Sequence, residues 1–147
     1  MDRQKNVLVI DAQGGGLGKQ LISAIRKEID EEWRGRYMIL AVGTNSAATA
    51  AMLKAGADTA ATGENSVVVA CKKADVIVGP LGIVMADAML GEVTERMAAA
   101  VATAQARRIL IPFSNCDTWI AGTDGLNMGR LIEDAVARLK LSLTEIV

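Results

Sequence analysis

The stretch Asp11-Ala-Gln-Gly-Gly-Gly-Leu-Gly-Lys19 decides the fold, because it joins a short apolar run to a helical pattern. The run Asn6–Asp11 contains Val-Leu-Val-Ile, which is typical of a strand buried on both faces. The stretch Gly18–Trp33 that follows places its apolar residues at helical spacing. Glycines in such a turn permit positive φ and a close approach of the backbone to a phosphate, and the start of the helix favours an anion. We therefore predict a phosphate-binding loop at residues 11–19.

Outside this loop, short apolar runs alternate with helical stretches along the whole chain. Further strands are expected at Tyr37–Val42, Ala57–Ala61, Asp75–Val78, Ile109–Pro112 and Thr118–Ala121. Further helices are expected at Asn45–Lys54, Glu64–Lys73, Ile83–Ala106 (with a break near Gly91 and a restart at Thr94 or Glu92) and Asn127–Leu141. This alternation predicts an α/β fold, doubly wound in three α/β/α layers of the Rossmann kind, with a mostly parallel sheet of five to six strands. Ligands of such folds bind at the carboxyl ends of the strands.

Length and composition point to one compact domain over residues 1–147, with no linker or repeat. Hydrophobic residues make up 51% of the chain but aromatic residues only 3%, so the core is expected to be aliphatic. The net charge of −1 provides no basic field for a nucleic-acid backbone, which disfavours nucleic acid as a partner. Because no signal peptide or membrane-length apolar segment is recognisable, we expect a cytoplasmic protein without a membrane partner.

The titratable residues limit the chemistry that can be expected. The chain has no histidine, and its two cysteines, Cys71 and Cys116, are too few and too far apart for a zinc site. No metal site is therefore expected. Cys71 follows a run of small apolar residues, which indicates a packing role.

The glycine loop best matches the G-x-x-x-G-x-G pattern of short-chain dehydrogenases, with Ala12, Gly16 and Gly18 in register. The expected ligand is NADP or NAD. Candidate cofactor-binding residues belong to this loop, to the turn after the second strand or to the end of the fourth: Gln13, Gly14, Gly15, Gly16, Leu17, Gly18, Thr44, Asn45, Ser46, Gly79 and Pro80.

Two other nucleotide sites are less consistent with the sequence. A P-loop would need glycine at Gln13 and a hydroxyl residue at Gln20, although Gly18-Lys19 fits. An NAD site usually has an acid about 20 residues after the loop, and a methyltransferase-like site also needs one after the second strand. No Asp or Glu occurs from Trp33 to Ala57. Small donors at residues 44–46 stand there instead, and they suit either a 2′-phosphate or a helix N-cap.

Longer stretches resemble one bacterial family of unknown function. They are Gln13-Gly-Gly-Gly-Leu-Gly18, Gly43-Thr-Asn-Ser-Ala-Ala-Thr-Ala-Ala-Met-Leu-Lys-Ala-Gly-Ala-Asp58, Thr62-Gly-Glu-Asn65 and Gly79-Pro-Leu-Gly-Ile83. The resemblance implies a short single-domain protein of this fold. It implies no particular activity.

Catalytic residues are harder to assign than binding residues. Tyr37 has no lysine four residues later, which excludes the short-chain dehydrogenase mechanism. Candidates at strand ends are Asp11, Cys116 and Asp117. The Asp11 carboxylate would repel a phosphate unless it faces a sugar hydroxyl, a metal or a backbone N–H group.

Three functions therefore stay open, and whether the protein is an enzyme is undecided. The first is a nucleotide-binding sensor or subunit. The second is a small oxidoreductase or isomerase whose site is completed by a second subunit, and the third is a binder of phosphosugars or nucleoside phosphates. We also expect a homodimer, because a helix over Ile83–Ala106 would be apolar nearly all round.

Overall fold

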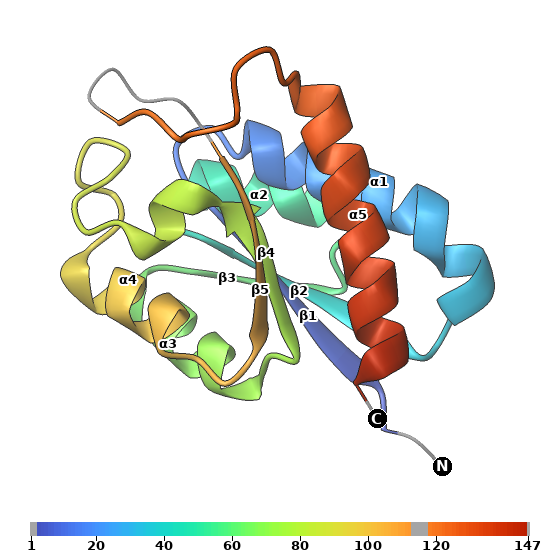
Figure 1. The fold of residues 1–147 in the computed structure, drawn as a ribbon. Coiled ribbons are helices and arrows are strands. Elements are labelled where there is room, and N and C mark those ends of the chain that lie inside the picture. The colour runs from blue at the N-terminus through green and yellow to red at the C-terminus, as the bar shows by residue number, and fades with distance from the viewer. Residues whose placement is uncertain (1–2, 113–117, 147) are drawn as a thin grey trace.

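A five-stranded parallel sheet lies between two layers of helices in the computed structural model, which describes residues 3–112 and 118–146 (Figure 1). The strands are β1 (Lys5–Asp11), β2 (Tyr37–Gly43), β3 (Thr59–Thr62), β4 (Val76–Pro80) and β5 (Arg107–Ile111). The helices are α1 (Gly16–Trp33), α2 (Ser46–Ala55), α3 (Glu64–Lys73), α4 (Glu95–Ala102) and α5 (Met128–Glu145), with a 3₁₀ helix η1 (Leu81–Val84) after β4. The predicted doubly wound α/β architecture is confirmed.

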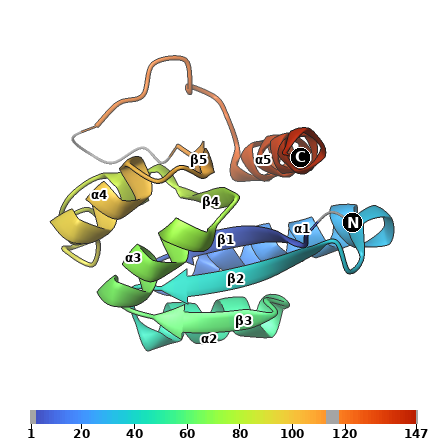
Figure 2. The ribbon, with the colours of Figure 1, turned by 90° about the horizontal axis from the view of Figure 1, so that it is seen from below.

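The position of β1 at the centre of the sheet explains why its sequence is apolar at successive positions instead of alternating. Val7 and Val9 face a core formed with α1, α2 and α5, whereas Leu8 and Ile10 face a second core formed with α3 and α4 (Figure 2). A strand that is buried on both faces gains from apolar side chains at every position. The run Val-Leu-Val-Ile is therefore the physical basis of the three-layer arrangement.

The strand order is β3-β2-β1-β4-β5, so β1 and β4 are neighbours at the centre of the sheet. The chain leaves β1 through α1 on one face of the sheet and leaves β4 through η1 and α4 on the other face. The connections after β1 and β4 therefore diverge at the carboxyl ends of these two strands. In open α/β sheets this switch point is where ligands bind.

The predicted helical region over Ile83–Ala106 is wrong for the residues before Glu95, whereas the predicted break near Gly91 and restart at Thr94 are confirmed. The chain forms η1, then a series of turns, and resumes helical structure only at Glu95, where Thr94 accepts the Met97 N–H and acts as N-cap. Small apolar residues suggested helix up to a break near Gly91, but Asp87, Met89 and Leu90 already adopt left-handed conformations that no right-handed helix contains.

The long helix that is apolar nearly all round, on which the expected homodimer depends, is therefore not formed. The short helix α4 is amphipathic, since it buries Met97, Ala98 and Val101 and exposes Ala99 and Ala102. The homodimer stays a prediction without support from an all-apolar helix.

The predicted last strand, Thr118–Ala121, is also wrong. Thr118 makes an isolated bridge, and the residues after it are irregular until Asn127 caps α5 by accepting the Arg130 N–H.

Within the described ranges, none of the helices has the length and apolar character needed to cross a bilayer.

A polar network joins the start of β2 to α1. The Tyr37 hydroxyl donates to Asp30 and accepts a hydrogen bond from Arg26 at 3.1 Å. Arg26 also donates to the Gly56 carbonyl and to Asp58. Burial, reinforced by the hydrogen bond to Asp30, raises the pKa of Tyr37 to about 12.

Tyr37 is the chain's only tyrosine, so its ionisation can be followed directly by phenolate absorbance. We expect a midpoint of about 12 in the folded protein and about 10 in urea. Because the folded state keeps the proton more strongly, stability should fall as pH rises from the unfolded pKa through the folded one. A folded midpoint near 10 would contradict the network, and Tyr37→Phe, which abolishes the signal, is the control.

Candidate functional site

The glycine loop is held from beneath by the carboxylate of Asp11. Its Oδ1 accepts the Ala12 N–H at 2.8 Å and its Oδ2 accepts the Gly18 N–H at 2.7 Å. The residue is only 4% exposed. Burial raises the pKa of Asp11, whereas the hydrogen bonds from Gly18 and Ala12 oppose that rise. From the sequence, Asp11 is expected to face a sugar hydroxyl, a metal or a backbone N–H group, and the structure shows it bound to backbone N–H groups.

Two loop glycines are required by packing alone. Gly15 has φ +73°, and a Cβ there would lie 2.8 Å from the Ala48 Cα of α2. A Cβ on Gly18 would lie 2.5 Å from the Sδ of Met52. Helices α1 and α2 therefore approach closely because these positions lack side chains, whether or not a ligand is present.

The other two loop glycines have no such role. A Cβ on Gly14 or Gly16 would meet no atom within 4 Å. Within residues 3–112 and 118–146, the N–H groups of these two glycines also have no hydrogen-bond partner. Leu17, between them and Gly18, is buried in the core. At the entry to α1, Gly14 and Gly16 are thus the two glycines that combine a backbone N–H group unpaired within the described part of the chain with open space beside the Cα atom; we call this the open backbone of the loop.

The turn between β2 and α2 lies against this loop. The Asn45 side chain accepts the Ala48 N–H at 2.9 Å, so its predicted role as an N-cap is confirmed. Its amide nitrogen donates to the Gln13 carbonyl at 2.9 Å, and the Thr44 N–H donates to the Asp11 carbonyl at 3.1 Å. The ends of β1 and β2 are therefore joined through both main-chain and side-chain contacts.

Besides the glycine loop and the turn between β2 and α2, the site contains Glu92, which was not identified from the sequence. This residue lies 79 positions along the chain from Gln13, yet its Oε1 accepts the Gln13 N–H at 2.9 Å. The same oxygen accepts the Thr44 hydroxyl at 2.7 Å and the Asn45 amide at 2.6 Å. The Thr44 hydroxyl above all, with the Gln13 N–H, lowers the pKa of Glu92. No local pattern could have signalled a contact that forms only through the tertiary fold.

The remaining candidates have structural roles or cannot be placed. A Cβ on Gly79 would lie 2.5 Å from the Ile10 carbonyl oxygen, and Pro80 is buried at the end of β4. Ser46 is the first residue of α2. Cys116 and Asp117 lie outside the described residues. In the described part of the chain, no cluster of three or more acidic or cysteine side chains is placed to hold a metal.

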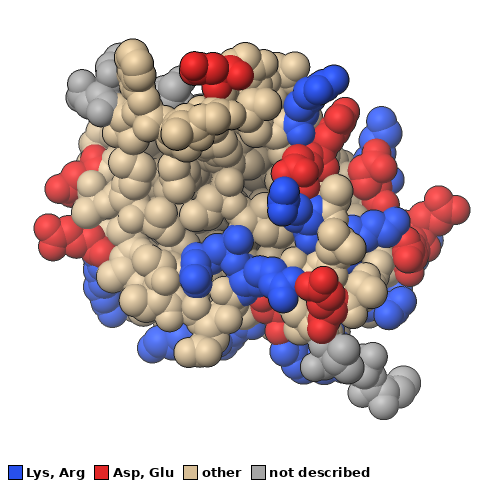
Figure 3. Space-filling model, viewed as in Figure 1, with Lys and Arg blue, Asp and Glu red and all other residues tan. Residues whose placement is uncertain are grey.

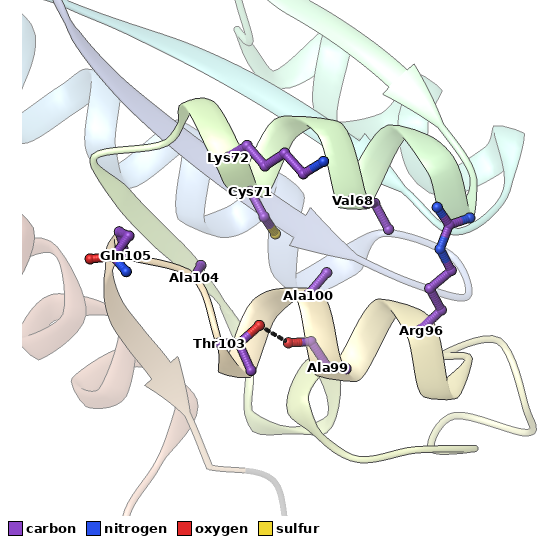
Figure 4. A pocket seen from close by; sticks show the side chains of 9 residues that line it. All are labelled: Val68, Cys71, Lys72, Arg96, Ala99, Ala100, Thr103, Ala104 and Gln105. Atoms are coloured by element: carbon purple, nitrogen blue, oxygen red, sulfur yellow. Dashed lines mark hydrogen bonds between the residues drawn. The ribbon is translucent and has the colours of Figure 1, made fainter.

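A separate pocket of about 470 Å³ lies between α3 and α4 (Figure 4). Its lining residues are Val68, Cys71, Lys72, Arg96, Ala99, Ala100, Thr103, Ala104 and Gln105. Burial raises the pKa of Cys71 to about 11, and the Thr103 hydroxyl donates to the Ala99 carbonyl at 2.6 Å. The pocket therefore offers no activated nucleophile, and it lies between helices rather than at the strand ends.

Charged side chains are unevenly distributed over the face of the molecule seen in Figure 3. Figure 3 shows a recess below the segment that leads into α5, surrounded mainly by uncharged side chains. Charged side chains gather instead over α5 and along the opposite end of the molecule. The carboxyl edge is thus the less charged end of this face.

Comparison with known proteins agrees with the resemblance seen in the sequence. Residues 6–144 match the family described as Domain of unknown function (DUF3842). The chain belongs to this family. No curated protein and no solved structure matches it significantly. The DUF3842 description assigns no reaction, so an account of function depends on the geometry of the site.

The different roles of the glycines lead to a stability prediction. Gly15→Ala should lower the free energy of unfolding by about 1–3 kcal/mol, because it combines a left-handed backbone with a clash against α2. Gly16→Ala, in open space, should be neutral or slightly stabilising, by about 0.5 kcal/mol. Urea unfolding measures both variants. Equal losses of stability in the two variants would show that Gly15 and Gly16 do not have different packing roles.

Proposed function

We propose that the chain binds a nucleotide, NADP or NAD, at the carboxyl edge formed by β1, β2 and β4. The observation that carries this proposal is the open backbone at Gly14 and Gly16, beside a turn whose other glycines are used in packing. A loop built only for packing has no need of glycine at these two positions. A ligand that approaches the backbone closely gives such a reason.

The residues at this edge fit a dinucleotide in two respects. The free N–H groups of Gly14 and Gly16 lie at the positive end of α1, which favours a phosphate. The Asp11 charge lies beneath them, but it is buried and directed at Ala12 and Gly18. The turn at Thr44 and Asn45 lies where the ribose of a dinucleotide binds in folds of this class.

Binding, rather than a reaction, is the function that these contacts support. A bound nicotinamide ring supplies hydride transfer, but proton transfer would need an acid or base from the protein. Asp11 at the end of β1 and Glu92 in the segment before α4 both accept several hydrogen bonds within the protein. We therefore propose a nucleotide-binding module and no particular reaction.

Calorimetric titration with NADP, NAD, ATP and AMP tests the proposal. The wild-type protein should bind at least one dinucleotide, and Gly16→Val should weaken that binding by about tenfold or more, because its side chain fills the space over the loop. Gly129→Val, in the first turn of α5, is the matched control and should bind normally.

Other outcomes would replace the proposal with a specific alternative. Magnesium-dependent ATP binding without dinucleotide binding would indicate a P-loop-like site. Binding of AMP alone would favour a nucleoside-phosphate binder. No binding of any of the four ligands would contradict the nucleotide hypothesis.

A further inference from the structure

The carboxylate of Glu92 is fixed through one of its two oxygens. The Gln13 N–H, the Thr44 hydroxyl and the Asn45 amide all donate to Oε1. Among residues 3–112 and 118–146, no N–H or O–H group donates to Oε2. Glu92 therefore presents one hydrogen-bond acceptor in a set position, and its side chain is only half-buried.

The segment that carries Glu92 has an unusual backbone. Asp87, Met89 and Leu90 all have positive φ, between 55° and 62°, although none is glycine. The segment is closed by hydrogen bonds from the Asp87 N–H to the Val93 carbonyl at 2.7 Å and from the Val93 N–H to the Ala88 carbonyl at 3.2 Å. Unfavourable conformations of this kind persist where the surrounding structure maintains them, often at binding sites.

The charge of Glu92 follows from its donors. Three hydrogen bonds to one oxygen favour the ionised form, so the side chain is an anion at neutral pH. Burial chiefly raises the pKa of Asp11, and the negative charge of Glu92 raises it further. The edge therefore carries negative charge beside β2, where the sequence between Trp33 and Ala57 supplies no acid.

An acceptor at the end of β2 has a defined use in dinucleotide sites, where a carboxylate there binds the ribose hydroxyls. We propose that Glu92, through its free Oε2, accepts hydrogen bonds from an unsubstituted ribose diol, so that the site takes NAD and rejects NADP. This inference rests on the nucleotide site proposed above. A 2′-phosphate would bring its negative charge against the fixed carboxylate, whereas ribose hydroxyls supply the donors that Oε2 lacks.

The experiment compares NAD with NADP by calorimetry on the wild-type protein, Glu92→Gln and Glu92→Ala. The wild type should bind NAD about tenfold or more tightly than NADP. Glu92→Gln removes the charge and should weaken NAD binding by about tenfold while improving NADP binding, so that the preference is lost. Glu95→Gln, an exposed acid in the first turn of α4, is the control and should keep the preference.

Several results would overturn the inference. NADP binding as tight as NAD binding in the wild type would do so without any variant, even if the substitutions prevented folding. Tighter NAD binding by Glu92→Ala would show that the Glu92 carboxylate repels a phosphate of the ligand instead of binding its ribose. If neither dinucleotide binds, the proposed nucleotide site itself fails, whereas a preference for NADP refutes only the role of Glu92.

Discussion

The buried carboxylate of Asp11 is the interaction on which the carboxyl edge depends. It stands at the end of β1 and binds the N–H groups of Ala12 and Gly18, so it fixes both ends of the glycine turn. A buried carboxylate without such partners would be strongly destabilising. Because the turn is fixed, α1 begins at Gly16 and Gly15 lies against α2. The same geometry directs the Gln13 N–H toward Glu92.

The glycine loop consequently has two roles that its sequence does not separate. Gly15 and Gly18 allow two helices to approach each other, whereas Gly14 and Gly16 leave backbone exposed where ligands of this fold bind. The number of glycines alone would assign all of them to a ligand. Packing distances show that half of the loop is already explained by the protein core, and only the other half supports a binding function.

Most of the fold could be predicted because it follows from short-range patterns. Apolar runs such as Val76–Val78 indicate buried strands, and their alternation with helices indicates a parallel sheet. The segment before α4 could not be predicted, because left-handed conformations at Met89 and Leu90 have no signature in residue type. Glu92 was missed for a different reason. Its role arises from three donors on two distant turns, and only the assembled sheet brings them together.

The central claim is that a dinucleotide lies across the ends of β1 and β2, and amide chemical-shift mapping during titration with NAD tests it most directly. The account predicts that the largest shifts occur at Gly14, Gly16, Thr44 and Asn45. Small shifts are expected around the pocket between α3 and α4. Shifts concentrated at that pocket, with the glycine loop unaffected, would contradict the account.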